Sequence, residues 1–132
     1  PLRADDIDGL KLVRQNTFLP IILDEPICTC KDIAQFVGLC DGINIKLMKC
    51  GGLTEALKMI NLTKSLKLKI MLGCMIESSL GITAMAHLAS LADYLDLDGH
   101  LLISNDPFKG VKLVKSKLVL PEESGLGVKR RS

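Results

Sequence analysis

The sequence predicts an α/β fold in which successive strand–helix units surround a parallel sheet. Short segments rich in Ile, Leu and Val alternate with amphipathic stretches of helical period, which is the pattern of repeated βα units. Polar residues follow the apolar segments at their carboxyl ends. With 48% hydrophobic and 24% charged residues among 132, the composition suits one globular domain with a buried core.

Four strands and four helices are predicted in alternation. The strands are residues 21–23, 43–47, 69–73 and 94–97. The helices are residues 5–16, a segment that Thr29 caps together with Asp32, a segment from about Thr54, and residues 81–92. Their predicted apolar faces comprise Ile7, Leu10, Val13, Ile33, Phe36, Val37, Leu57, Ile60, Ile82, Met85 and Leu88. Residues 111–114 and 117–120 are predicted to form a hairpin before a looser tail.

Charge and composition exclude several classes of partner. A net charge of +2 with 3% aromatic residues does not provide the basic, stacking surface that nucleic acid requires. No apolar run approaches the roughly 18 residues of a membrane span. The first residues show no apolar signal region, and five cysteines without repeated metal-ligand spacing fit a reducing compartment. We therefore expect a cytoplasmic protein that binds neither nucleic acid nor membrane.

Charged residues at the strand ends mark the predicted binding edge. They are Asp24, Glu25, Lys46, Glu77, Asp96 and Asp98. In barrels and open α/β sheets, ligands bind at the carboxyl ends of the strands. Asp24 and Lys46 are separated by 22 positions, about the length of one βα unit, so their side chains should project from neighbouring strands.

Asp24 and Lys46 have two possible roles. A carboxylate oxygen suits Mg²⁺, and a lysine whose pKa is lowered by a nearby cation can act as a general base. The alternative is a simple salt bridge. Lys46 belongs to an otherwise apolar strand, where an unpaired ammonium is costly, so it needs either a partner or a function.

Other polar features also have two explanations. If they lie on one strand, Asp96 and Asp98 point to the same side and can clamp one cationic group, whereas helix capping is the alternative. Gly51-Gly52 suits an anion-binding nest or a tight turn. His87 and His100 lack a second histidine at metal-ligand spacing, and we expect both to be structural.

Four segments carry a resemblance to a known family: residues 20–25, 43–52, 73–81 and 95–98. In this order, and nearly without gaps, they resemble the muconate-lactonizing subgroup of the enolase superfamily, and within it the L-Ala-D/L-Glu dipeptide epimerases. The resemblance implies that residues 1–132 form the C-terminal half of a modified TIM-type (β/α) barrel, with about four βα units and a C-terminal hairpin and tail. The N-terminal capping domain and the first barrel strands are then absent from this sequence.

The resemblance also implies roles for the residues at the strand ends. Asp24 corresponds to the third of three Mg²⁺ ligands, and Lys46 to an acid/base lysine on one face of the substrate. Asp96 and Asp98 correspond to the acid pair that holds the α-ammonium of a dipeptide.

Three further residues have supporting roles by the same resemblance. Glu25 and Asn44 stand beside the metal ligand, and Glu77 supports the active site. Pro26 is a departure, because the family usually has a small polar residue there.

The implied reaction is a 1,1-proton transfer at the α-carbon of a dipeptide, through an enolate that the metal stabilises. The second lysine and the other two metal ligands belong to earlier strands, which this sequence does not contain. We therefore expect the chain alone to be inactive, and to associate with the N-terminal half of the barrel or with another copy of itself. The alternatives are a muconate-type cycloisomerase or o-succinylbenzoate synthase, and a non-catalytic flavodoxin-like module that binds Mg²⁺.

Overall fold

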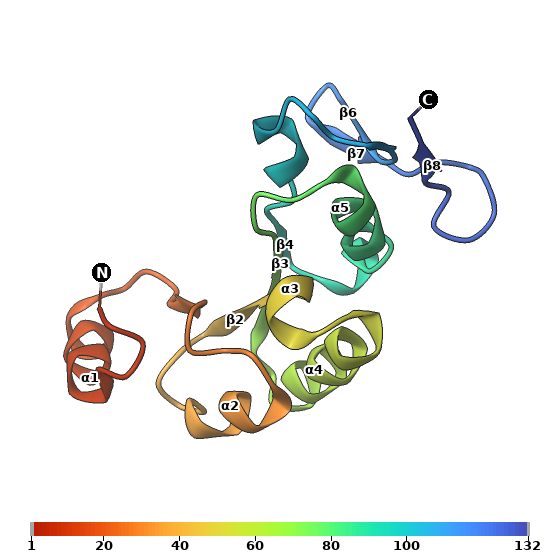
Figure 1. Cartoon of the computed structure of the whole chain (residues 1–132). Coiled ribbons are helices and arrows are strands. Elements are labelled where there is room, and N and C mark those ends of the chain that lie inside the picture. The colour runs from red at the N-terminus through yellow and green to blue at the C-terminus, as the bar shows by residue number, and fades with distance from the viewer. Residues whose placement is uncertain (1, 132) are drawn as a thin grey trace.

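Segments of isoleucine and leucine form a four-stranded parallel sheet with the strand order β1-β2-β3-β4 (Figure 1). The computed structural model describes residues 2–131. The strands of this sheet are β1 (Ile22–Leu23), β2 (Gly42–Lys46), β3 (Lys69–Gly73) and β4 (Tyr94–Leu95). β2 and β3 pair over their whole length, from Gly42 opposite Lys69 to Lys46 opposite Gly73. The predicted α/β class is confirmed, and the carboxyl ends of the strands meet at one edge.

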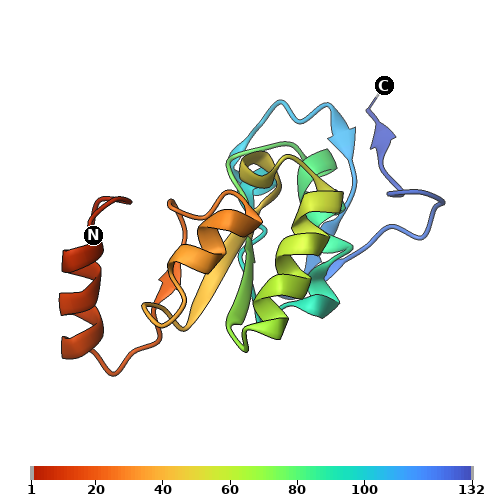
Figure 2. The same cartoon turned by 90° about the horizontal axis from the view of Figure 1, so that it is seen from below.

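The helices provide the other half of the core. They are α1 (Ile7–Asn16), α2 (Cys30–Gln35), α3 (Leu47–Cys50), α4 (Leu53–Ser65) and α5 (Ser79–Ala86), with 3-10 turns η1 (Ala89–Leu91) and η2 (Gly99–Leu102). Figure 2 shows α2 and α4 on one side of the strands, and α1 apart from them beyond β1. The strand residues buried in the core with these helices are Ile43, Ile45, Ile70 and Leu72. Asn44 and Lys46 alternate with the buried isoleucines of β2 and point to the opposite face.

Local sequence signals explain how two helices begin. Asp32 caps α2 as predicted, because its carboxylate accepts hydrogen bonds from the backbone N–H of Thr29 at 2.6 Å and of Cys28 at 3.0 Å. Gly51 and Gly52 have φ values of 89° and 132°, which only glycine adopts readily. These two glycines connect α3 to α4, so they serve as a tight turn.

Several predicted details of the helices are wrong. Val37 is 49% exposed because α2 ends at Gln35, before the predicted apolar face is complete. Leu57 is 39% exposed because the buried face of α4 follows the helical spacing of Ala56, Met59, Ile60 and Thr63. The one-turn helix α3 was not predicted. The predicted helix 81–92 is instead α5 followed by η1.

The C-terminal part forms two small antiparallel ribbons beside α5 (Figure 1). The predicted hairpin is present as β6 (Lys112–Val114) and β7 (Lys117–Val119), and Lys115 and Ser116 at its tip both have positive φ. A second ribbon, which was not predicted, pairs β5 (Phe108–Lys109) with β8 (Lys129–Arg130). The backbone N–H of Val111 donates to the hydroxyl of buried Thr83 at 2.8 Å, which ties this region to α5.

An aspartate stands before β2, and another before β4, in the same local arrangement. Asp41 Oδ2 accepts from the backbone N–H of Ile21 at 2.8 Å, and the Asp41 N–H donates to the Ile21 carbonyl at 2.8 Å. Asp93 makes the same pair of contacts with Ile70, at 2.9 Å and 2.8 Å. Each carboxylate thus fixes the start of its strand beside the neighbouring strand, at the end of the sheet away from the site.

Asp41 also ties α1 to the sheet, through a hydrogen bond of 2.5 Å from Arg14. The Arg14 guanidinium and the Ile21 N–H lower the pKa of Asp41. Because the pKa is lower in the folded chain, this stabilisation is complete above the unfolded pKa and is lost as the pH falls through the folded value.

We predict that Asp41→Asn lowers the free energy of unfolding by about 1 kcal/mol at pH 7, since it removes the charge that Arg14 pairs with at a partly exposed position. The difference should shrink below about pH 4. Urea unfolding at both pH values measures it. The matched control is Asp8→Asn, because Asp8 pairs with Lys11 on α1 with its side chain 93% exposed. Equal stability of the two variants at pH 7 would contradict the prediction.

Candidate functional site

The strand ends bring the predicted site residues to one edge of the sheet. Asp24 follows β1, Lys46 ends β2, and Cys74 follows β3. Lys46 Nζ lies 2.8 Å from Asp24 Oδ2, so the predicted meeting of these two side chains is confirmed. The Lys46 side chain is 12% exposed, whereas that of Asp24 is 36% exposed and accessible from this edge.

Asp24 is the centre of a cluster of charged and polar groups. The side-chain amide of Asn44 donates to Oδ2 at 3.1 Å. Lys49, on α3, donates to Oδ1 at 2.8 Å and to the backbone carbonyl of Asp24 at 2.5 Å. Two ammonium groups therefore share one carboxylate, and together the three charges sum to +1.

The pKa of Lys46 is governed by its direct contact with the Asp24 carboxylate. Burial alone would lower the pKa of Lys46, but the hydrogen bond and the charge of Asp24, followed by the charge of Glu25, outweigh it and raise the pKa. Burial alone would raise the pKa of Asp24, yet the two lysines together lower it. The predicted lowering of the lysine pKa concerned a nearby cation such as bound Mg²⁺, and it stays a prediction.

Lys49 was given no role on the basis of the sequence. Its spacing offers a signal, since it lies three positions after Lys46 and within the turn that follows the strand. On a helical turn, residues three apart lie on the same side. The signal was missed because α3 is too short to show a helical period.

Asn44 on β2 and Gly73 on the adjacent strand β3 lie against each other next to Asp24. Asn44 is 4% exposed, and its Oδ1 is buried without a hydrogen-bond partner. A Cβ atom at Gly73 would lie 2.5 Å from that oxygen, so the amide requires glycine at this position of β3.

The Asp24 carboxylate suits Mg²⁺ as one part of its coordination, because carboxylate oxygens are hard donors of the kind that Mg²⁺ prefers. Asn44 turns its amide N–H toward this carboxylate and so supports it. Within residues 2–131, no three His, Cys, Asp or Glu side chains gather into a group that could hold a metal ion. The fit of these residues to Mg²⁺ is therefore partial.

The acid pair lies beyond the end of β4, which is shorter than predicted. The strand ends at Leu95, so strand alternation does not align Asp96 with Asp98. Both exposed carboxylates nevertheless line one cavity of about 200 Å³. Asp98 precedes η2, but its side chain makes no capping hydrogen bond to that turn. The structure therefore does not support the capping alternative for Asp98. The other lining residues are Leu95, Leu97, His100, Leu101, Leu113 and Leu118.

Cys74 lies between Lys46 and this acid pair. The backbone N–H groups of Asp98 and Gly99 point to its sulfur, and its charge when ionised would act on Lys46. Burial raises the pKa of the Cys74 thiol, which is therefore neutral. A Cβ atom at Gly99 would lie 2.0 Å from the Met75 carbonyl, so this close turn requires glycine.

Glu77 belongs to the loop between β3 and α5. One carboxylate oxygen accepts from the Met75 N–H at 3.3 Å, and the other occupies the space that a Cβ at Gly81 would fill. Among the described residues, no hydrogen bond or ion pair joins it to Asp24 or Lys46. The carboxylate thus lies over the first turn of α5, where the helix dipole favours it.

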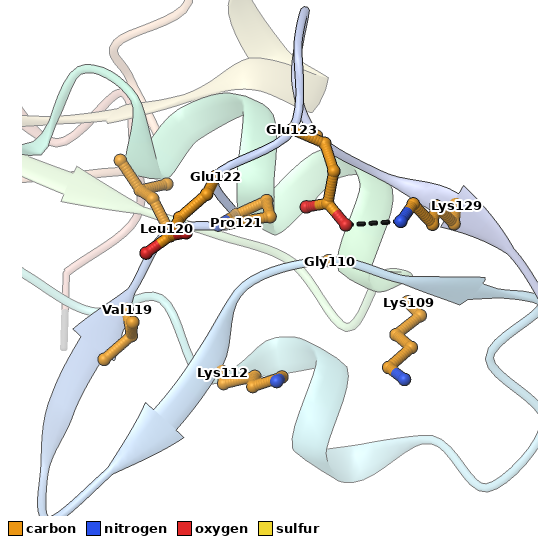
Figure 3. A pocket seen from close by; sticks show the side chains of 10 residues that line it. Lys109, Gly110, Lys112, Val119, Leu120, Pro121, Glu122, Glu123 and Lys129 are labelled. Atoms are coloured by element: carbon orange, nitrogen blue, oxygen red, sulfur yellow. Dashed lines mark hydrogen bonds and ion pairs between the residues drawn. The ribbon is translucent and has the colours of Figure 1, made fainter.

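A larger cavity of about 530 Å³ lies in the C-terminal region (Figure 3). Lys109, Lys112 and Lys129 border it, and Lys129 pairs with Glu123. None of the strand-end residues lines this cavity. We therefore place the candidate site at the strand ends, where the buried charges are.

His87 connects the end of α5 to the C-terminal tail. Its Nε2 atom lies 3.3 Å from the Leu126 carbonyl, and this contact fits the structural role predicted for His87.

In the part of the chain that the structure describes, no helix combines the length and the apolar character that crossing a bilayer demands.

Comparisons with known proteins agree with this arrangement. The family model "Enolase C-terminal domain-like" matches residues 1–131. The L-Ala-D/L-Glu epimerase of Bacteroides thetaiotaomicron is 44% identical over 128 residues, which are 97% of this chain and 33% of that protein. The chain thus spans about a third of that relative's length.

Two solved structures show the same relation. A substrate-liganded L-Ala-D/L-Glu epimerase from Bacillus subtilis is 36% identical with a TM-score of 0.89, covering 97% of this chain and 37% of that one. A dipeptide epimerase from Enterococcus faecalis, complexed with Mg and L-Leu-L-Tyr, is 39% identical with a TM-score of 0.89, covering 98% and 39%. The matched part is the C-terminal half of the barrel in these proteins. The chain therefore belongs to the enolase C-terminal domain-like family.

Proposed function

We propose that this chain forms the C-terminal part of a Mg²⁺-dependent epimerase that inverts the α-carbon of a dipeptide of the L-Ala-D/L-Glu type. The observation that carries the proposal is the contact of 2.8 Å between Asp24 and the largely buried Lys46, at a sheet edge that also presents Asp96 and Asp98. The relatives support the substrate class, because they are epimerases of dipeptides.

In this proposal, each polar group has a separate task. The Asp96 and Asp98 carboxylates bind the α-ammonium of the dipeptide and so orient it. Lys46 faces the α-carbon from one side and accepts or returns its proton at Nζ. It can accept a proton only in its neutral form, which the positive charge of a metal bound at Asp24 would favour. Asp24 holds the metal and keeps Lys46 in place by the ion pair. When bound, Mg²⁺ supplies positive charge that stabilises the enolate oxygens.

The remaining parts of the site come from outside this chain. A lysine on the opposite face and two further carboxylate ligands would belong to the N-terminal half of the barrel. Exposed apolar side chains support such a partner, because Phe18 is 96%, Leu19 63% and Leu102 65% exposed. We propose that residues 1–132 alone are inactive.

The acid pair distinguishes this function from the alternatives within the superfamily. Cycloisomerases and succinylbenzoate synthases have no substrate ammonium to bind, whereas Asp96 and Asp98 form no ion pair among the described residues and remain available for one. The family match is inconsistent with the flavodoxin-like module.

The first test is a chimera in which residues 1–132 replace the matching C-terminal part of the Bacteroides epimerase. We predict Mg²⁺-dependent epimerisation of L-Ala-D-Glu by the chimera and none by the isolated chain. Lys46→Met should lower epimerisation at least about 100-fold, since it removes one acid/base group. In D₂O, the Lys46→Met variant should still exchange one α-proton for deuterium. This is the α-proton of the isomer in which that proton faces the other lysine.

Proton NMR measures both epimerisation and exchange. Lys58→Met is the matched control, because Lys58 lies on α4 with its side chain 60% exposed and pairs with Glu55, on the same helix. A folded chimera that binds Mg²⁺ but exchanges no dipeptide α-proton would show that the proposed function is incorrect.

The second test concerns the acid pair. We predict that the double variant Asp96→Asn, Asp98→Asn raises the KM of the chimera for L-Ala-D-Glu by about 10–100-fold, because a charge-assisted hydrogen bond contributes about 1.5–3 kcal/mol. The unsubstituted chimera should reject N-acetylated dipeptide, and the variant should lose this preference. Steady-state kinetics on both substrates decides the matter. An unchanged KM would instead favour a substrate without an ammonium group.

A further inference from the structure

The short helix α3 turns Lys49 back toward the neighbouring strand. Its side chain is 9% exposed, and its Nζ contacts the residue that follows β1, 25 positions earlier. Lys46 and Lys49 thus approach the same Asp24 from the end of β2 and from the following turn. The two approaches use different oxygens, Oδ2 for Lys46 and Oδ1 for Lys49.

Lys49 contacts both the main chain and the side chain of Asp24, whereas Lys46 contacts the side chain. Its ammonium binds both the carboxylate Oδ1, at 2.8 Å, and the backbone carbonyl, at 2.5 Å. A donor that bridges the main chain and the side chain of one residue closes a ring and restricts the side-chain torsions to one rotamer. The rotamer that results keeps Oδ2 directed at Lys46 and Asn44.

The charge balance argues against a purely stabilising role. One lysine is sufficient to neutralise Asp24, and a second buried ammonium adds desolvation and repulsion from Lys46. A residue that only linked the β1–α2 loop to α3 could do so through a neutral donor to the carbonyl. The additional charge lies instead against the carboxylate proposed to bind the metal.

We infer that Lys49 is a positioning residue, which fixes the carboxylate of Asp24 so that one oxygen faces Lys46 and the group is preorganised for Mg²⁺. This inference rests on the proposed function. Groups that orient a metal ligand typically affect metal affinity or activity by 10–100-fold when they are replaced.

The experiment uses the chimera and measures Mg²⁺ binding by calorimetry as well as turnover. Lys49→Met should raise the Kd for Mg²⁺ by about 10–100-fold and lower kcat by a similar factor, while KM for the dipeptide changes less than about threefold. Lys49→Arg should recover most of the affinity, because its planar fork can reach both oxygens. The control Lys58→Met removes an exposed lysine and should change neither quantity.

The outcomes separate the two proposals. A folded Lys49→Met variant whose Kd for Mg²⁺ is within about twofold of that of the unsubstituted chimera, or lower, would overturn the role of Lys49, because loss of the ammonium also relieves its repulsion of Mg²⁺. So would a Lys49→Arg variant with no recovery of affinity. If Lys49→Met does not fold, Lys49→Gln replaces it, since it keeps an N–H donor without the charge, and unchanged affinity there overturns the inference.

Calorimetry does not depend on turnover. An inactive chimera that binds Mg²⁺ contradicts the proposed function, and its Lys49 variants still test the positioning role. A folded chimera that binds no Mg²⁺ contradicts both.

Discussion

The parallel pairing of β2 with β3 is the constraint on which the rest of the structure depends. Their register, Gly42 opposite Lys69 through Lys46 opposite Gly73, places the ends of both strands at the same level. The isoleucines and leucines of one face are buried against the helices, while the other face carries Asn44 and Lys46. A shift of one residue would exchange these faces, turning the lysine toward the helices and the core isoleucines toward the site.

The parallel pairing of β1 with β2 brings Asp24 beside Lys46, and the charged cluster that results is costly. Lys46 and Lys49 are both largely buried and share the carboxylate of Asp24, while the next negative charge, that of Glu25, is exposed. A cluster of this kind is a poor source of stability, since desolvation offsets much of the attraction. The aspartates at the opposite end of the strands, Asp41 and Asp93, instead pair with backbone N–H groups and stabilise the sheet. Stability and site chemistry therefore lie at opposite ends of the same strands.

Local sequence signals predicted the elements whose energetics are local. The capping of α2 by Asp32, the full span of β3 and the two-residue turn of the β6–β7 hairpin follow from neighbouring residues. The strand ends also located Asp24 and Lys46 correctly. The prediction failed where burial is decided by distant partners, as for Leu57, and where a helix is too short to repeat its apolar pattern, as for α3. The cavity shared by Asp96 and Asp98 arises from a turn rather than from strand alternation.

The sequence by itself determined the alternation of strands and helices, because apolar periodicity requires one face of each element to be buried. It also determined which charged residues stand at the strand ends, since each apolar run ends in a polar one. Only the tertiary structure decided which of those charges meet. The contacts of Lys49 with Asp24 span 25 positions and depend on how α3 turns back over the sheet, which no local pattern specifies. The direction of the Lys46 pKa shift depends on the same packing, because it is set by a carboxylate from the neighbouring strand.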